Sequence, residues 1–306
     1  SARPGGAGDM RVSLCLLIAS GCLAMRLNPV GWSAQNHARL QVLLDQPVST
    51  AHGCAPVAAF DADGTLWSGD AYGAFSSVLV SKGLIDGDAS AAVEREYGRS
   101  EEQERERWLL ESFALFRGLR LEQLHAAAEE AWDGPGLGAT LRPEMTDLVS
   151  CLRAAGWRVL IVTASPAEAV LRGAQALGVP EGDVLAVRLE ADAAGVISGR
   201  PSPVMPLTWR EGKAAALDAY GVAGRLQFAA GNSMDDLAML RRSRGASLLC
   251  VPRPSAEQDP WCGAAEGPQR IAAVAAAEGH WLHEATAGGE EWRRLAWYAA
   301  QGEESS

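Results

Sequence analysis

The chain has 306 residues, of which 48% are hydrophobic and 21% are charged, an ordinary balance for a globular protein with a sizeable core. This length suits one large domain, or a core with a smaller insertion. The formal net charge of -11 argues against nucleic acid or an anionic membrane surface as a partner. No apolar run is long enough to predict a membrane-spanning helix in the mature protein.

Residues 1–22 have the pattern of an export signal. Met10-Arg11 provides a basic start, residues 12–19 are apolar, and small residues follow. The ending Ala19-Ser20-Gly21-Cys22 resembles a bacterial lipobox, in which the cysteine would become the lipidated first residue. We therefore expect an exported protein, periplasmic or anchored as a lipoprotein. Leu23 after the cysteine is compatible with the outer membrane; a buried N-terminal helix is the alternative.

Residues 23–55 form a polar N-terminal extension, in which residues 34–44 predict a helix that packs on the core. The cysteines outside the signal have no metal-ligand spacing: Cys54, Cys151, Cys250 and Cys262. An oxidising compartment would permit a bridge between Cys250 and Cys262. Buried free thiols are the simpler expectation.

The first predicted strand, residues 56–60, stops abruptly at Asp61, Asp63 and Gly64. An apolar run bounded by turn residues is typical of a buried strand, and chemistry in an open parallel sheet gathers at the carboxyl ends of strands. Two carboxylates there suit a hard cation such as Mg2+, and one is available as a nucleophile. The glycine allows a turn in which backbone amides approach a phosphate. Taken alone, however, this pattern more often marks an acidic turn.

From residue 70 to 141 the pattern changes to helix. Residues 94–107 carry Glu and Arg at spacings that allow pairs one helical turn apart, and residues 121–132 predict another helix. Gly134-Pro135-Gly136 then breaks the pattern. Because this segment directly follows the first strand, we expect an all-helical cap over residues 70–141 that lies above the carboxyl end of that strand.

After Pro143 strands and helices alternate, which implies a Rossmann-like parallel sheet with helices on both faces. The predicted strands are residues 157–162, 184–187, 225–230 and 246–251, and the predicted helices are 144–155, 167–177, 211–220 and 236–242. Residues 190–199 predict a hairpin. The tail from Pro252 is predicted to be mostly helical, anchored by Trp281, Trp292 and Trp297. The core domain therefore comprises residues 56–69 and 142–306.

Complementary polar residues lie at four separate strand or helix ends: Asp61 and Asp63; Thr163; Lys213; and Asn232, Asp235 and Asp236. Their order and spacing, over residues 57–251, resemble the haloacid dehalogenase-like (HAD) superfamily of aspartyl-phosphate phosphatases. The chain is most similar to the phosphoserine-phosphatase-like branch, whose helical C1 cap lies between the first and second motifs. Exported phosphorylcholine phosphatases are similar in layout.

The resemblance implies a role for each of these residues. Asp61 would attack phosphorus to form an aspartyl phosphate. Asp63 would protonate the leaving alkoxide and then activate water. Thr163 would hydrogen-bond a phosphate oxygen, helped by the Ala164 amide near a helix start. Lys213 would neutralise the charge that accumulates between the nucleophile and the phosphoryl group.

The resemblance also implies a Mg2+ site formed by Asp61, the Asp63 backbone carbonyl and the fourth motif. The family commonly has aspartate where this chain has Asn232, although exported relatives with Gly-Asn-Ser belong to the pattern. An amide oxygen can coordinate Mg2+ but adds no charge. Either Asn232 is a weaker ligand or Asp235 takes part of the role, and Asp236 would hold the metal directly or through water.

Trp67 and Tyr72 follow the nucleophile closely enough to face the substrate, and an aromatic ring there would bind a quaternary ammonium group by cation–π contact. The alternative, slightly favoured, is that Trp67 packs the cap onto the core. The expected function is a Mg2+-dependent phosphatase for a small phosphorylated metabolite, phosphoserine- or phosphorylcholine-like. A phosphotransferase or phosphoprotein phosphatase is a second possibility. A degenerate HAD-like lipoprotein, acting as a binding or envelope module, is the alternative from another class.

Overall fold

The computed structural model describes residues 26–46, 54–100, 102–133, 136–252 and 268–285. The predicted export signal, its lipobox cysteine, Cys262, Trp292 and Trp297 lie outside these residues. Among the described helices, none combines the length and the apolar character needed to cross a membrane.

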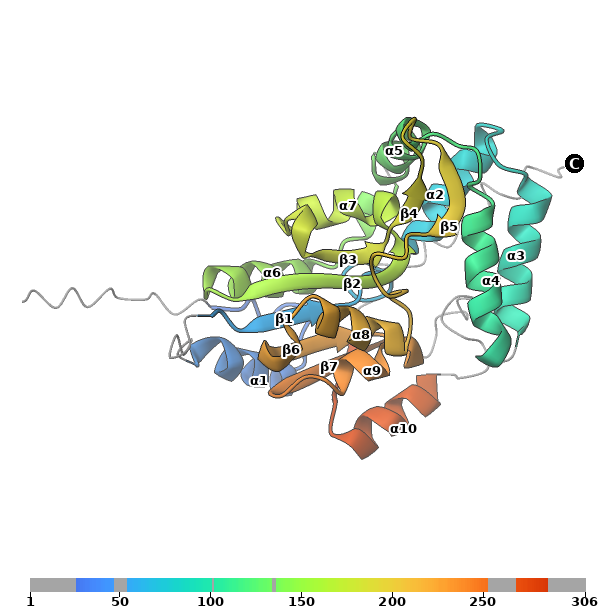
Figure 1. The fold of residues 1–306 in the computed structure, drawn as a ribbon. Coiled ribbons are helices and arrows are strands. Elements are labelled where there is room, and N and C mark those ends of the chain that lie inside the picture. Colours follow the sequence, from blue (N-terminus) through green and yellow to red (C-terminus); the bar gives the residue numbers. More distant parts are fainter. Residues whose placement is uncertain (1–25, 47–53, 101, 134–135, 253–267, 286–306) are drawn as a thin grey trace, which may run out of the picture.

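A six-stranded parallel sheet forms the centre of the molecule (Figure 1). In spatial order its strands are β3 (Val184–Val187), β2 (Arg158–Pro166), β1 (Val57–Phe60), β6 (Leu226–Gly231), β7 (Ala246–Pro252) and β8 (Trp281–Ala285). Phe60 at the end of β1 pairs with Ile161 of β2 and with Ala230 of β6. Because the strands run in parallel, the segments that follow these three residues emerge together at one edge of the sheet.

Helices cover both faces of this sheet. One face carries α1 (Ala34–Asp45), α6 (Pro143–Ala154) and α7 (Ala167–Ala176), and the other carries α8 (Glu211–Ala219), α9 (Leu237–Leu240) and α10 (Pro268–Glu278). Along β1, Ala58 and Phe60 pack into the first layer, whereas Val57 and Ala59 pack into the second. A strand buried on both faces is apolar at every position, which explains the uninterrupted apolar run. The predicted α/β fold is therefore confirmed.

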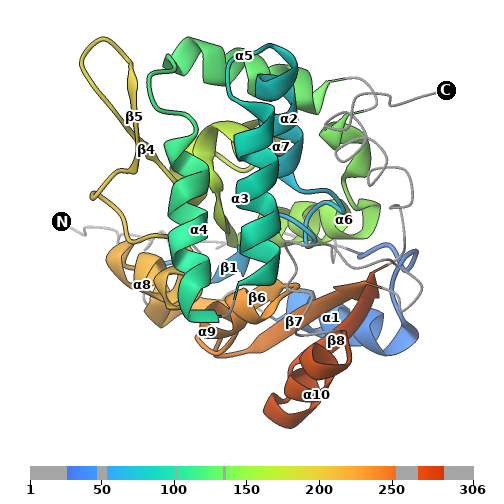
Figure 2. The same ribbon diagram turned by 90° about the vertical axis from the view of Figure 1, so that its right-hand side faces the viewer.

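Four of the helices between β1 and β2 stand over the carboxyl edge of the sheet. They are α2 (Ala71–Ser81), α3 (Gly87–Arg99), α4 (Glu102–Ala114) and α5 (Leu121–Trp132), and Figure 2 shows α3 and α4 in front of β1 and β6. We call these four helices the cap. Their place in the chain lies within the predicted residues 70–141.

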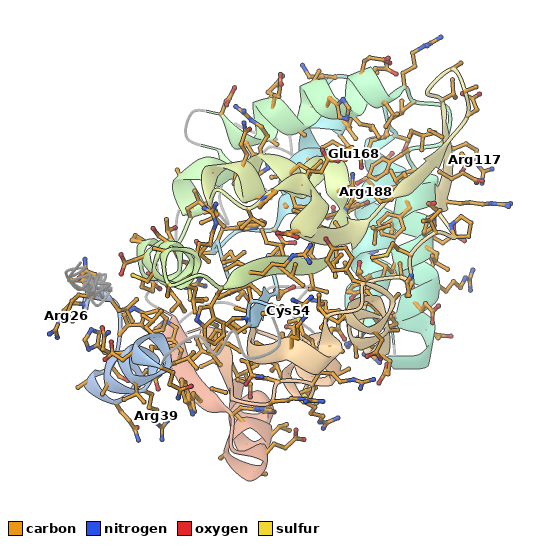
Figure 3. The ribbon with its side chains drawn as sticks, turned by 60° about the vertical axis from the view of Figure 1, so that its left-hand side comes forward. Arg26, Arg39, Cys54, Arg117, Glu168 and Arg188 are labelled. Carbon is orange, nitrogen blue, oxygen red and sulfur yellow. The ribbon has the colours of Figure 1, made fainter. Side chains whose placement is uncertain are left out.

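The cap is joined by a segment that the sequence analysis did not assign to it. This segment is the hairpin of β4 (Leu189–Ala191) and β5 (Ile197–Pro201). Gly118 N, which follows α4, donates to the carbonyl of Ile197 in the hairpin at 2.9 Å. The Arg117 side chain, labelled in Figure 3, donates to the Ser198 carbonyl at 3.2 Å. The hairpin was predicted, but its attachment to the cap was not. Because the hairpin joins the cap, the structure over the sheet edge is not all-helical.

The N-terminal extension packs on the core as predicted, and it contacts a strand that was not predicted. Leu40 and Leu43 of α1 are buried, and Asn36 Nδ2 donates to the carbonyl of Leu282 in β8 at 2.7 Å. The prediction of a mostly helical tail is wrong for Trp281–Ala285, because pairing with the exposed edge of β7 outweighs local helical preference.

The described cysteines are free thiols. Cys151 and Cys250 are buried, as expected, whereas Cys54, just before β1, is exposed. Burial raises the pKa of the Cys250 thiol to about 12, so this thiol is unreactive near neutral pH.

Candidate active site

A cavity of about 110 Å³ lies between the carboxyl edge of the sheet and the cap. The core side of its wall includes Asp61, Asp63, Thr163, Ala164, Ser165, Trp209, Lys213, Asn232 and Asp235. The cap side includes Tyr72, Tyr97, Leu109, Ser112 and Phe113. The structure thus brings polar residues from all four predicted motifs to one cavity.

Lys213, in the first turn of α8, links two of these motifs. Its Nζ lies 2.6 Å from Asp61 Oδ1 and 2.6 Å from Asp236 Oδ1. Burial raises the pKa of Asp61 to about 7; the charge of Asp236 adds to this shift, and Lys213 opposes it. Burial alone would lower the pKa of Lys213, but the two carboxylates raise it above its usual value. The lysine is therefore a fixed cation beside Asp61.

Asp61 is oriented by neighbours on the same turn and the adjacent strand. Its backbone N donates to the carbonyl of Ala230 in β6 at 2.8 Å, and Thr65 Oγ1 donates to its Oδ2 at 3.1 Å. The side chain of Asp61 is only slightly exposed and lines the cavity. A carboxylate held in this way at a strand end is well placed to attack an electrophile in the cavity.

The Asp63 side chain turns toward the cap. Its Oδ1 accepts from Trp67 Nε1 at 2.7 Å and from the backbone N of Ala71 at 2.6 Å. Its Oδ2 accepts from Ser165 Oγ at 2.6 Å. Burial raises the pKa of Asp63, although these three hydrogen bonds oppose the shift. Ser165 was not among the predicted site residues. The signal for it was its place two residues after Thr163 on one strand, because such residues share a face.

Thr163 and Ala164 both line the cavity at the end of β2. The Thr163 hydroxyl accepts a hydrogen bond of 3.1 Å from the backbone N of Ser165. Its carbonyl accepts from the hydroxyl of Thr208, a second residue that the sequence analysis missed. Thr208 lies on the loop before α8, so this bond ties the loop that leads into the helix of Lys213 to the end of β2.

The oxygens best suited to a metal ion lie around Asn232. One terminal atom of its amide is 3.2 Å from Asp61 Oδ2 and 3.1 Å from the Asp63 carbonyl oxygen. An amide NH2 in this position would donate to both oxygens; an amide oxygen would complete a set of three oxygens that fits a hard cation. In the described part of the chain, no three His, Cys, Asp or Glu side chains converge as a metal cluster, so a cation here would need the carbonyl and the amide.

The two aspartates of the fourth motif have different surroundings. Asp236 Oδ2 accepts from the backbone N of Asn232 and of Ser233, each at 2.9 Å, so this carboxylate shapes the loop as well as binding Lys213. Asp235 forms an ion pair of 2.7 Å with Arg210 and accepts from Trp209 Nε1 at 3.0 Å. The structure therefore places Asn232, and not the carboxylate of Asp235, beside Asp61 and the Asp63 carbonyl.

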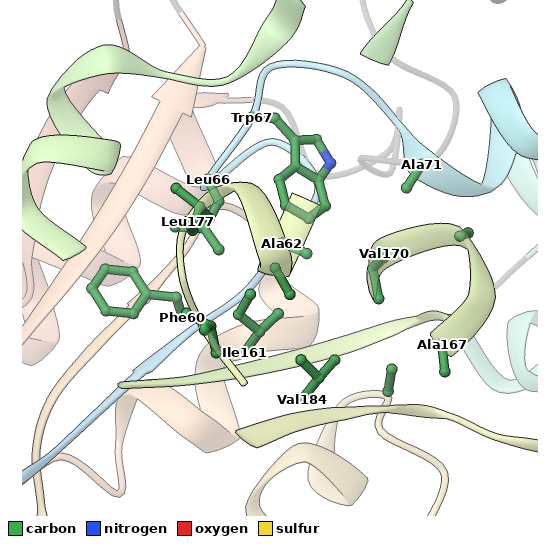
Figure 4. Close-up of a cluster of buried hydrophobic side chains, with 14 of the residues drawn as sticks. Phe60, Ala62, Leu66, Trp67, Ala71, Ile161, Ala167, Val170, Leu177 and Val184 are labelled. Atoms are coloured by element: carbon green, nitrogen blue, oxygen red, sulfur yellow. The ribbon is translucent and has the colours of Figure 1, made fainter. Parts of the chain in front are cut away.

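Trp67 does not face the cavity, so the predicted substrate contact is corrected. Its side chain is fully buried and packs edge-on against Trp132 of the cap, with ring centroids 5.0 Å apart. Figure 4 shows it among apolar side chains that include Leu66 and Val170. The slightly favoured alternative, in which Trp67 packs the cap onto the core, describes its position. Tyr72, in contrast, lines the cavity.

Comparison with solved structures finds similar folds. A protein with unknown function from Bordetella pertussis Tohama I is 21% identical, with a TM-score of 0.61 over 76% of this chain and 99% of that chain. A conserved functionally unknown protein from Anaerococcus prevotii DSM 20548 is 15% identical, with a TM-score of 0.61 over 84% and 94% of the two chains. A phosphoserine phosphatase with a phospho-aspartyl intermediate analogue is 19% identical, with a TM-score of 0.45 over 64% and 86%. At these identities the likeness to the first two structures concerns the fold alone.

Comparison with curated proteins gave no match. A family model described as haloacid dehalogenase-like hydrolase matches residues 58–241, which is more than half of the chain and contains every motif described above. The resemblance seen in the sequence is thereby confirmed: the chain belongs to the haloacid dehalogenase-like hydrolase family.

Proposed function

We propose that this protein is a Mg2+-dependent phosphatase that hydrolyses a small organic phosphomonoester through an aspartyl phosphate on Asp61. The observation that supports this most strongly is the position of Lys213 Nζ, 2.6 Å from both Asp61 Oδ1 and Asp236 Oδ1. A carboxylate nucleophile repels an anionic phosphoryl group. A buried cation beside it removes that repulsion and stabilises the negative charge of the transition state.

The reaction has two steps. In the first, a carboxylate oxygen of Asp61 attacks phosphorus, the ester P–O bond breaks, and Asp63 gives a proton to the departing alkoxide. In the second, Asp63 takes a proton from water, the resulting hydroxide attacks phosphorus, and the bond to Asp61 breaks to release phosphate. Thr163 and the Ala164 amide supply donors for the phosphoryl oxygens.

A magnesium ion would be held by the carboxylate of Asp61, the carbonyl of Asp63 and the amide oxygen of Asn232. When bound, it would supply positive charge that neutralises the phosphoryl group. Because the amide contributes no charge, we expect weaker metal binding than with a carboxylate at the same position. Asp236 supports this site indirectly, through the backbone of Asn232 and through Lys213.

The size and walls of the cavity favour a small alcohol as the leaving group. Its volume is about 110 Å³, and Tyr72, Tyr97 and Phe113 supply aromatic surface on the cap side. Such rings suit either a compact neutral group or an ammonium group bound by cation–π contact, as in phosphorylcholine. A phosphoserine-like substrate also has a suitable size. The cap argues against a phosphoprotein substrate, because it covers the approach to Asp61.

The test is release of inorganic phosphate from a panel of small phosphomonoesters by the purified chain, with Mg2+ and with a chelator. Asp61→Asn is the diagnostic variant, and Asp218→Asn, an exposed aspartate on α8 paired with Arg242, is the matched control. We expect metal-dependent release that Asp61→Asn abolishes and Asp218→Asn retains. Phosphate release that survives Asp61→Asn would contradict the mechanism. Binding of phosphate without any turnover would favour the degenerate binding or envelope module.

We further propose that the protein is exported and anchored through Cys22. The basis is the pattern of residues 1–22 alone. Metabolic labelling of bacteria with radioactive palmitate should label the wild-type protein but not Cys22→Ser. Equal labelling of both would contradict lipid attachment at this cysteine.

A further inference from the structure

The two carboxylate oxygens of Asp63 have different kinds of hydrogen-bond partner. Oδ1 accepts from Trp67 Nε1 at 2.7 Å and from the backbone N of Ala71 at 2.6 Å. Oδ2 is 2.6 Å from the hydroxyl of Ser165. An indole N–H and a backbone N–H can only donate, whereas a serine hydroxyl can donate or accept.

This difference determines which oxygen can carry a proton. A proton on Oδ1 would point toward two hydrogens that already occupy that oxygen. Both donors are fixed: Trp67 is fully buried against Trp132, and the Ala71 amide begins α2. A proton on Oδ2 is compatible with its surroundings, because the Ser165 hydroxyl can rotate to accept.

We propose that the proton which Asp63 exchanges during catalysis is carried by Oδ2, and that Ser165 is the positioning residue for this oxygen. This inference rests on the proposed phosphatase function. When Oδ2 is ionised, the Ser165 hydroxyl donates to it, as in the structure. When Oδ2 is protonated, the Ser165 hydroxyl rotates so that its own hydrogen points away from Oδ2 and its oxygen accepts from Oδ2–H until the alkoxide takes that proton. Ser165 thus keeps Oδ2 in place at the cavity wall, where both residues are found.

The proton balance of the reaction follows from this assignment. In the first step the Oδ2–H bond breaks and an O–H bond forms on the leaving alkoxide, which departs as an alcohol. Oδ2 becomes anionic and accepts from Ser165. In the second step Oδ2 takes a proton from the attacking water, which restores the starting state. Ser165 itself gains or loses no proton.

The nature of the leaving group provides a sharp test. An alkoxide is a strong base and needs a proton as it departs, whereas acetate from acetyl phosphate is a weak base and leaves without one. We would measure kcat/KM for acetyl phosphate and for the alkyl phosphate that the wild-type protein hydrolyses fastest. This parameter covers formation of the aspartyl phosphate, the step in which Asp63 acts as an acid.

For Ser165→Ala we expect kcat/KM for the alkyl phosphate to fall by roughly 10-fold or more, since acid catalysis as a whole contributes about 100-fold to 10,000-fold. We expect the value for acetyl phosphate to change much less. Ser165→Thr, which keeps the hydroxyl, should retain most of the alkyl phosphate activity. In an Asp63→Asn background, Ser165→Ala should cause little further loss, because the two residues act as one unit.

Equal losses with both substrates would overturn the inference, because they would mean that Ser165 only maintains the end of β2. Unchanged activity with both substrates would overturn it as well. Thermal unfolding of each variant, with Ser68→Ala as a serine-to-alanine control, separates misfolding from loss of positioning. If either result overturns the role of Ser165, turnover by the wild-type protein still supports the proposed phosphatase function. Absence of wild-type turnover with every substrate would instead contradict that function.

Discussion

Gly64 and Asn232 are so close that a Cβ atom on Gly64 would lie 2.1 Å from Asn232 Nδ2. Gly64 also has a φ of +73°, a backbone angle that residues other than glycine rarely adopt. The turn after Asp61 therefore leaves room for the Asn232 amide in its present position only while residue 64 lacks a side chain. In that position the Asn232 amide lies next to Asp61 and the Asp63 carbonyl.

Gly64→Ala should therefore reduce both stability and activity. The positive φ alone costs about 1 kcal/mol, and the displaced Asn232 amide should remove most of the metal-dependent turnover. Gly83→Ala is the matched control, since Gly83 has a φ of +66° with nothing within 4 Å of the added Cβ. The control should lose similar stability and keep its activity. Equal activity losses in the two variants would show that the Gly64–Asn232 contact does not matter for function.

Lys213→Met should destabilise the fold as well as abolish turnover. The change leaves the buried carboxylates of Asp61 and Asp236 without their shared cation, and breaking a buried ion pair costs about 3–5 kcal/mol. Urea unfolding measures this loss. Lys82→Met, which removes a partly exposed pair with Glu130, should change stability by less than about 1 kcal/mol. A Lys213→Met protein as stable as wild type would contradict the proposed charge balance.

The stability of the metal-free protein should depend on pH through Asp61. Burial raises the pKa of Asp61 from 3.8 to about 7, so the folded state keeps a proton that the unfolded chain has already lost. The contribution of Asp61 to the free energy of unfolding is therefore fully present below the pKa of the unfolded chain. It is lost as pH rises through the pKa of the folded state. Chelator-treated wild type should lose more stability between acidic and slightly alkaline pH than Asp61→Asn does. Parallel pH profiles for the two proteins would contradict the raised pKa.

Asn232→Asp should tighten Mg2+ binding, because it adds a negative charge to the set of oxygens around the site. We expect roughly a tenfold lower dissociation constant, equivalent to about 1.4 kcal/mol, measured by calorimetry on the purified protein. Asn28→Asp, near the surface of the N-terminal extension, adds the same charge elsewhere and should leave binding unchanged. Weaker binding in Asn232→Asp would argue that the amide acts as a donor and not as a ligand.

Much of the site could be predicted from the sequence because its residues occur at ends of apolar strands. The run before Asp61 and the run before Thr163 mark β1 and β2, and parallel pairing brings their ends together. The hydrogen bond between Ser165 and Asp63 depends on the direction of the Ser165 side chain at the end of β2. Side chains alternate between the two faces of a strand, so Ser165 could have been expected on the same face as Thr163.

Other features depend on contacts between distant segments. The strand at Trp281–Ala285 forms because β7 offers an unpaired edge, and its own residues have no strong strand preference. Burial of Trp67 depends on Gly173 in α7, where an added Cβ would lie 2.8 Å from the Trp67 ring. No residue close to Trp67 in the sequence indicates that Gly173 leaves room for its ring. The hairpin was recognisable from Ala194-Gly195, but its docking site on the cap was not.

The most direct test of the central claim is to trap the covalent intermediate. Wild-type protein would be mixed briefly with radioactive phosphorylated substrate, quenched in acid, digested and mapped by mass spectrometry. The account predicts an acyl phosphate, labile to hydroxylamine, on Asp61 in the wild type and no label in Asp61→Asn. Label on another residue, or turnover without any labelled aspartate in a rapid quench, would contradict it.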